Sequence, residues 1–202
     1  SISNIGLLST RSLAHPLWND EGCIVTSREG RDNWNAIDPN FVIDDDDQPW
    51  MVWGSFWDGI QMARLDTTMH IAKGEIPRTI ARRYNLNEKG LLADLPENPN
   101  PPKNPTSDYA GPNAIEAPFI FKHADWYYLF VSWDYCCQGS KSNYRVAVGR
   151  SRTVEGPYLD RNGKDMRLGG GTLFFEGDKV NYDAAGHCSV YRFDDEDLFF
   201  CH

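Results

Sequence analysis

The sequence predicts an all-β fold built from repeated antiparallel units. Helical periodicity is almost absent, whereas short apolar or alternating runs bounded by Gly, Pro, Asn and Asp recur along the chain, which is typical of strands and hairpins. The stretch Asn-Ala-Ile-Asp at residues 35–38 returns as Asn-Ala-Ile-Glu at residues 113–116. Repeats of a few strands, several tens of residues apart, are typical of β-propeller blades.

The first unit is predicted from an apolar run at residues 41–43, followed by an acidic turn. Strands over residues 50–56 and 59–66 follow this turn. The acidic run 44–47 lacks the spacing and the glycine of an EF-hand loop, so we interpret it as a solvated hairpin turn.

The same order of elements returns twice. The second unit has predicted strands at residues 119–121, 126–132 and 144–150, and a third copy has predicted strands at 185–192 and 198–201. Between the first two units, a short helix is predicted within residues 76–87. Six prolines between residues 96 and 112 forbid regular structure there.

About three units fit into the 202 residues, and three blades do not close a ring. We therefore expect residues 1–202 to be part of a single propeller domain whose N-terminal blade and C-terminal blades lie outside this chain. The chain has no apolar run long enough to span a bilayer, and its first residues lack the features of a secretory signal.

Composition narrows the class of ligand. The net charge of −9 argues against nucleic acid as a partner, because that affinity comes from clustered Lys and Arg. A neutral or cationic ligand fits better. The seven Trp, nine Tyr and ten Phe supply rings on which neutral sugars often stack, although packing is the commoner use of an aromatic side chain.

The five cysteines have no zinc-site spacing. Cys136 and Cys137 are adjacent, where an ordinary disulfide is geometrically awkward, so buried thiols are the favoured interpretation. The disulfide state of this pair stays open at this point.

A candidate site emerges when the three copies are aligned on their first strands. Asp38, Glu116 and His187 then occupy the same position. The first strand of each blade lines the central channel of a propeller, so the three side chains are expected to converge on the axis. Two carboxyl groups across a polar pocket are the equipment of glycoside hydrolysis. The structural alternative is that Asp38 and Glu116 are ordinary turn residues at strand starts.

Five motifs, in order along the chain, carry a resemblance to a known family. They are residues 35–40 (NAIDPN), 54–59 (GSFWDG), 113–118 (NAIEAP), 132–137 (SWDYCC) and 186–190 (GHCSV). From about residue 18 to the end, the chain resembles the endo-α-1,5-L-arabinanases of glycoside hydrolase family 43. The resemblance implies a five-bladed β-propeller, of which this chain covers about three blades.

The resemblance also implies roles for the aligned residues. Glu116 matches the general acid, and Asp38 matches the aspartate that orients this acid and modulates its pKa. His187 matches the histidine near an axial metal ion, usually calcium. No segment before Asp38 carries the His-Asp-Pro context of the family's general base, so we expect that base to lie outside this chain.

Five further residues are predicted to bind substrate at the rim of the cleft: Asn35, Ser55, Trp57, Asp58 and Asn113. Trp57 is the candidate stacking platform, and the two asparagines are candidate donors to sugar hydroxyls. The structural alternatives are a hairpin turn with a packed Trp and local turn hydrogen bonds.

The resulting hypothesis is a secreted, inverting hydrolase, monomeric when complete, that cuts internal α-1,5 bonds of arabinan. An exo-acting arabinofuranosidase or β-xylosidase is the nearest alternative, and the Pro-rich segment 96–112 is one place where that choice would be made. A carbohydrate-binding propeller without catalysis is an alternative of another class, favoured by the missing base. A scaffold that binds protein partners ranks last, because it has no need for carboxylates on the axis.

Overall fold

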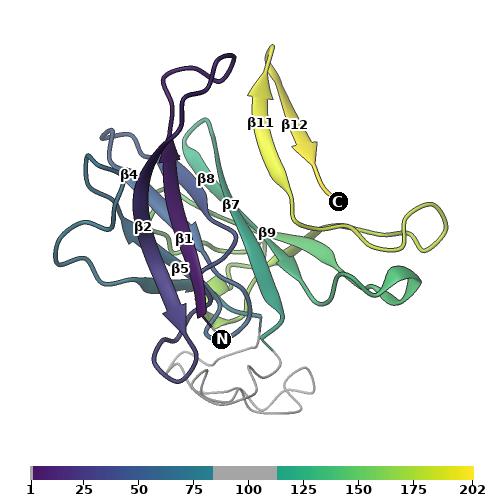
Figure 1. The fold of residues 1–202 in the computed structure, drawn as a ribbon. Coiled ribbons are helices and arrows are strands. Elements are labelled where there is room, and N and C mark those ends of the chain that lie inside the picture. The colour runs from purple at the N-terminus through teal and green to yellow at the C-terminus, as the bar shows by residue number, and fades with distance from the viewer. Residues whose placement is uncertain (1, 84–112) are drawn as a thin grey trace.

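The computed structural model describes residues 2–83 and 113–202, and the Pro-rich segment 96–112 lies outside the described residues. The described part of the chain is almost entirely β-structure, with antiparallel pairing in every sheet (Figure 1). The prediction of an all-β fold is therefore confirmed. No helix in this part is long and apolar enough to cross a bilayer.

Two four-stranded sheets form the middle of the molecule. The first contains β3 (Asn40–Ile43), β4 (Pro49–Trp53), β5 (Ile60–Arg64) and β6 (Arg78–Ala81), and the second contains β7 (Ile115–His123), β8 (Trp126–Trp133), β9 (Arg145–Ser151) and β10 (Thr172–Glu176). In both sheets the strands lie in the order of the sequence, which is the meander expected of a propeller blade.

A two-stranded hairpin lies on each side of this pair. One is formed by β1 (Ile2–Ser9) and β2 (Asn19–Arg28), and the other by β11 (Ser189–Phe193) and β12 (Glu196–Phe200). Figure 1 shows the first hairpin at one side of the sheets and the second at the other. The two short 3-10 helices are η1 (Gly139–Lys141) and η2 (Met166–Leu168).

Three apolar clusters hold these four layers together. The largest lies between the two sheets and includes Val52 and Met62 of the first and Leu129 and Val131 of the second. A second cluster joins the β1–β2 hairpin to the other face of the first sheet, and a third joins β11 to the other face of the second sheet.

Strand β4 shows how the sequence produces this layering. Its residues Trp50 and Val52 face one cluster, and Met51 and Trp53 face the other. Side chains alternate between the two faces of a strand, so a strand packed on both sides is apolar throughout. The uninterrupted run Trp-Met-Val-Trp is the result.

One local prediction needs correction, and one hairpin was missed. Residues 78–81, within the predicted short helix, form strand β6, which pairs with β5 as the fourth strand of its sheet. The β1–β2 hairpin was not predicted at all. Register shifts after Ile5 and after Leu7 interrupt its regular alternation, and this alternation is the signal by which a strand is recognised in a sequence.

Strands β3, β7 and β11 come together, since β7 contacts both of the others. The Asn40 side chain at the start of β3 accepts a hydrogen bond from the Ile120 amide of β7, at 2.9 Å. Each of these strands is the first of its sheet or hairpin, and each begins within one of the three aligned motifs.

Gly59 gives a test of how tightly the turn after β4 is built. Its φ is +87°, and a Cβ placed on it would lie 2.1 Å from the Ala81 carbonyl oxygen. Gly74 has a similar φ of +82° but open space around it. Gly59→Ala is expected to lower the free energy of unfolding by about 3 kcal/mol or more, because crowding adds to the left-handed strain. Gly74→Ala is expected to lower it by about 1 kcal/mol.

Chemical denaturation of both variants, followed by tryptophan fluorescence, measures the difference. Equal losses of stability in the two variants would mean that the backbone conformation alone, and not the close approach of Ala81, makes Gly59 necessary.

Candidate active site

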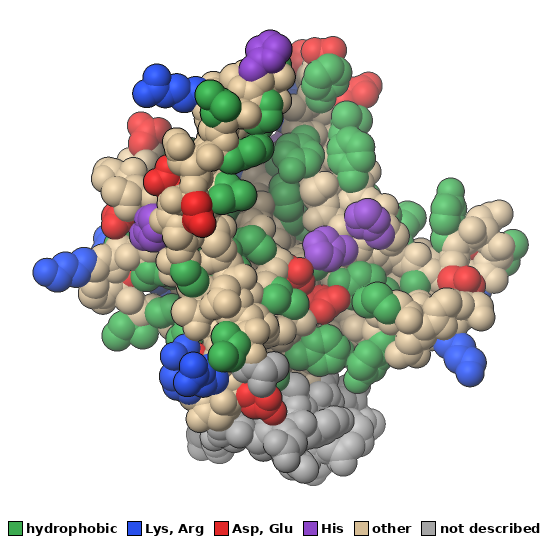
Figure 2. Space-filling view, in the orientation of Figure 1, with side chains coloured by type: hydrophobic (Ala, Val, Ile, Leu, Met, Phe, Trp, Pro, Cys, Tyr) green, Lys and Arg blue, Asp and Glu red, His purple; other side chains and the backbone are tan. Residues whose placement is uncertain are grey.

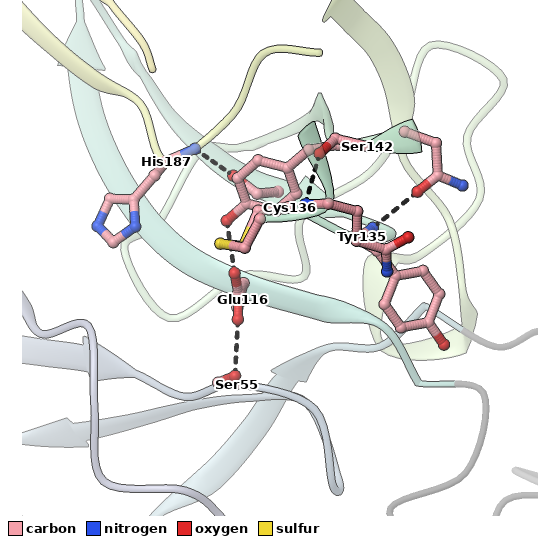
Figure 3. The surroundings of a disulfide bond; sticks show 11 residues. Ser55, Glu116, Tyr135, Cys136, Ser142 and His187 are labelled. Atoms are coloured by element: carbon pink, nitrogen blue, oxygen red, sulfur yellow. Dashed lines mark hydrogen bonds between the residues drawn. A yellow bond between two sulfur atoms is a disulfide. The ribbon is translucent and has the colours of Figure 1, made fainter. Parts of the chain in front are cut away.

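The Glu116 side chain is held by hydroxyl groups at both carboxylate oxygens. Ser55 Oγ donates to Oε2 at 2.8 Å, and the Tyr144 hydroxyl donates to Oε1 at 2.7 Å (Figure 3). Ser55 belongs to the turn after β4, whereas Tyr144 directly precedes β9, so the two donors come from different sheets. Both can also accept a hydrogen bond, so the pair can serve a neutral or an ionised carboxyl group.

A backbone irregularity aims Glu116 at these donors. Ala117 has a φ of +51°, and the pairing of β7 with β8 shifts between Glu116 and Phe119. Such a bulge turns a side chain out of the regular alternation of its strand. Glu116 also pairs with Ser55 across the two sheets, and the Phe56 amide donates to the Ile115 carbonyl at 2.7 Å.

A chain of hydrogen bonds connects His187 to this carboxylate. The His187 amide donates to Ser132 Oγ at 2.8 Å, as Figure 3 shows. Ser132 is fully buried and its side chain hydrogen-bonds to Tyr144, which in turn donates to Glu116. Burial strongly raises the pKa of Tyr144, so this hydroxyl keeps its proton at any working pH.

Asp38 lies close enough to Glu116 and His187 for both residues to affect its pKa. Burial raises the pKa of the Asp38 carboxyl group, His187 lowers it, and the negative charge of Glu116 raises it again. A hydrogen bond from the Ala117 amide lowers it in turn, and the net direction is upward. The three residues therefore lie near one another, and the roles assigned to them stay predictions from the resemblance.

Two neighbouring cavities open at this cluster. A cavity of about 680 Å³ is lined by Glu116, Tyr144 and Tyr182, together with Cys136 and Cys137. A cavity of about 580 Å³ is lined by Asp38, Ala117 and Tyr191. His187 and His202 line both. In Figure 2, histidine and acidic side chains gather near the middle of the visible face.

Three of the predicted substrate-binding residues instead support the site from within the protein. The Ser55 hydroxyl is engaged with Glu116. Asp58 forms a two-pronged ion pair with Arg82 and accepts from Thr79. The Asn113 side chain is fully buried, with its oxygen accepting from the Arg83 amide and its nitrogen donating to the Trp57 carbonyl.

These contacts favour structural roles for Asp58 and Asn113. A fully buried amide with partners at both ends does not meet a sugar hydroxyl, so the turn hydrogen bonds of the structural alternative describe Asn113 better. Asn35 and Trp57 remain candidates for substrate binding. Trp57 is half-buried in a left-handed backbone conformation, and Asn35 is half-buried beside Ala36, whose amide is held by Ser27.

Two features of the site were missed in the sequence. Tyr144 and Ser132 lie within predicted strands, and neither was assigned to the site, although Ser132 begins the motif at 132–137. The pairing of β7 with β8 sets Ser132 opposite Glu116, and the pairing of β8 with β9 brings Tyr144 alongside. The expectation of buried thiols at Cys136 and Cys137 is wrong, because the two form a disulfide between adjacent residues. Cys188 is the buried thiol, and burial raises its pKa to about 12, whereas Cys23 and Cys201 are exposed.

The described residues do not by themselves fit a calcium ion. His187 and His202 face each other with ring centroids 6.3 Å apart. Residues 2–83 and 113–202 contain no group of three or more His, Cys, Asp or Glu side chains placed to share an ion. Calcium takes six to eight oxygen ligands, so calcium binding at His187 stays a prediction from the resemblance.

Comparison with known proteins identifies the family. The family model described as glycosyl hydrolases family 43 matches residues 1–202. The chain belongs to this family. It is 40% identical over 92% of its length to the extracellular exo-α-(1→5)-L-arabinofuranosidase ArbA of Cellvibrio japonicus, covering 49% of that protein. It is 37% identical over 87% of its length to the extracellular endo-α-(1→5)-L-arabinanase 1 of Bacillus subtilis, covering 46% of it.

A solved structure confirms the fold of this family 43 chain. The exo-1,5-α-L-arabinanase from a bovine ruminal metagenomic library superposes with a TM-score of 0.83 at 47% sequence identity, over 98% of this chain and 59% of that one. The sheets described above are thus blades of the family's propeller. The chain spans about half the length of the curated relatives it matches.

Asp38 allows the electrostatics of the site to be tested through stability. Its φ is +55°, a conformation that Asn also tolerates, so Asp38→Asn removes the charge without backbone strain. A raised pKa means that the carboxyl group contributes its stability fully below the ordinary value of 3.8 and loses it as pH rises through the folded value. Relative to the wild type, the Asn variant is expected to be more stable at about pH 7 than at about pH 3.

Denaturant titrations at the two pH values measure this difference. Asp38→Ala serves as the control, since it removes the same charge but adds about 1 kcal/mol of left-handed strain at both pH values. An Asn variant that loses stability relative to the wild type as pH rises would contradict the assigned direction.

Proposed function

We propose that the protein containing this chain is a glycoside hydrolase that cleaves internal α-1,5-L-arabinofuranosidic bonds of arabinan with inversion. The observation that carries the proposal is the Glu116 carboxyl group, which lines a cavity while both of its oxygens are oriented by hydroxyl donors. The names of the relatives support the substrate class, because both describe enzymes acting on α-(1→5)-linked L-arabinose.

In this proposal Glu116 donates a proton to the oxygen of the leaving sugar. Ser55 and Tyr144 fix the direction of that donation, which matters because proton transfer requires hydrogen-bond distance and alignment. Asp38 acts as a second carboxyl group that orients the acid and sets its electrostatic surroundings. An inverting hydrolase also needs a carboxylate base on the other face of the sugar, and we place that base in a segment other than those described.

A neutral furanose polymer suits the charge of the chain. With a net charge of −9, the chain repels anionic polymers, whereas an uncharged polymer meets no such repulsion. Both curated relatives are named extracellular. We propose that the protein is secreted, since the plant cell-wall polysaccharide that it would cleave lies outside the cell.

Glu116→Gln tests the catalytic role directly. In the full-length protein, kcat/KM on linear arabinan is expected to fall by about 10²- to 10⁴-fold, because the amide cannot supply the proton. Reducing-end assays measure this loss, and Glu155→Gln is the matched control. Glu155 is an exposed carboxylate paired with Arg78, away from the cavity, so its loss should leave turnover unchanged.

Full turnover in Glu116→Gln would remove the basis for the enzyme assignment. A wild-type protein that binds arabinan without turning it over, and a Glu116→Gln variant that behaves in the same way, would favour the non-catalytic carbohydrate-binding propeller.

Exo-action is the second candidate, because the relatives named exo-acting are 40% and 47% identical to this chain. The products released early from linear arabinan separate the two modes. We expect a ladder of oligosaccharides with a rapid fall in viscosity, as random internal cleavage produces. Release of a single short product from the start, with viscosity nearly constant, would replace the endo assignment by exo.

A further inference from the structure

The disulfide between Cys136 and Cys137 lies in the wall of the cavity that contains Glu116. Both cysteines line it, together with Tyr182 and His187. Figure 3 shows Cys136 near the carboxylate of Glu116 and the residues that hold it. Cys137 is exposed, and Cys136 is half-buried, so the sulfur pair is open to a molecule that enters the cavity.

The loop that carries the disulfide is tied down at its base and at its tip. The Tyr135 amide donates to the Asn143 side chain, and the Asn143 amide donates back to the Tyr135 carbonyl, both at 3.0 Å. The Gln138 amide is held by Ser142 at 2.9 Å. Such closure fixes where the sulfur atoms lie.

A second loop of the same cavity is joined to this one. The Lys179 ammonium group donates to the carbonyl oxygen of Ser142. The next residues of that loop are held by Asp178, which accepts hydrogen bonds from three successive amides, at Val180, Asn181 and Tyr182. Lys179 therefore connects the loop that carries the disulfide to the loop that carries the exposed Tyr182 ring.

We propose that the Cys136–Cys137 disulfide is an apolar platform against which a sugar unit next to Glu116 packs. The inference rests on the proposed function, since it assigns a residue pair to substrate binding at the same site. Two bonded sulfur atoms and their methylene groups carry no hydrogen-bond donor, and sulfur is polarizable. They offer a surface to the C–H face of a sugar, while the polar groups of the cavity are left for its hydroxyls.

Reduction changes this surface in a defined way. A dithiol such as dithiothreitol transfers two electrons and two protons, so the S–S bond breaks, two thiols form and the reductant becomes its cyclic disulfide. The two sulfur atoms then separate to van der Waals contact, and each gains an S–H donor. The single flat patch is replaced by two independent side chains.

The test compares KM and kcat of the full-length protein on a short α-1,5-arabino-oligosaccharide before and after reduction. Thiol alkylation and mass measurement establish the state of the pair. Loss of the platform is expected to raise KM by about 2- to 10-fold, the size of a sulfur contact. We expect kcat to change by less than about 2-fold, because the contact is made equally in the ground state and the transition state.

The double variant Cys136→Ala/Cys137→Ala should show the raised KM from the start and no further response to reductant. Cys23→Ala, which removes an exposed thiol outside the cavity, should keep both the wild-type KM and the response. Circular dichroism of the reduced wild type checks that the fold persists.

Equal KM for the oxidised and reduced forms would overturn the proposal, and so would a fall in kcat at constant KM, which would indicate a positioning role instead. If no form of the protein hydrolyses the oligosaccharide, the proposed function fails, and calorimetric Kd values of the oxidised and reduced forms then decide on the platform alone.

Discussion

The candidate site depends on the contact between the turn after β4 and the beginning of β7. A backbone hydrogen bond from Phe56 to Ile115 and a side-chain hydrogen bond from Ser55 to Glu116 join the two sheets at one place. The apolar cluster between the sheets fixes the position of β4 relative to β7. The direction of the carboxylate therefore depends on how two sheets pack as well as on the irregularity in its own strand.

Many of the polar groups around Glu116 are used inside the protein. Asn113 holds the Trp57 carbonyl, and Asp58 is paired with Arg82. Buried polar groups that are fully satisfied make a site rigid, whereas unsatisfied ones are costly. The polar groups of this supporting layer are already engaged within the protein, so contact with a ligand falls to the groups that line the cavity.

The sequence was sufficient to place Asp38, Glu116 and His187 together. They occupy equivalent positions at the first strands of successive repeats, and the first strands of propeller blades lie side by side around the central channel. It was also sufficient for most strands of the two sheets. It could not distinguish a residue that touches substrate from one that supports the site, since Ser55 and Asn113 have the same chemistry in either role. Tyr144 was beyond reach for another reason, because its partnership with Glu116 arises only from strand pairing.

The pKa of Asp38 depends on residues from three repeats of the chain. Burial of Asp38 raises its pKa, His187 of the third repeat lowers it, and Glu116 of the second raises it. His187 itself is fixed by the hydrogen bond from its amide to Ser132 in the middle sheet, and the same serine supports the Tyr144 hydroxyl that holds Glu116. Two carboxyl groups with such different surroundings are suited to different protonation roles. No single blade produces this difference between the surroundings of Asp38 and Glu116, since it arises only when β3, β7 and β11 lie side by side.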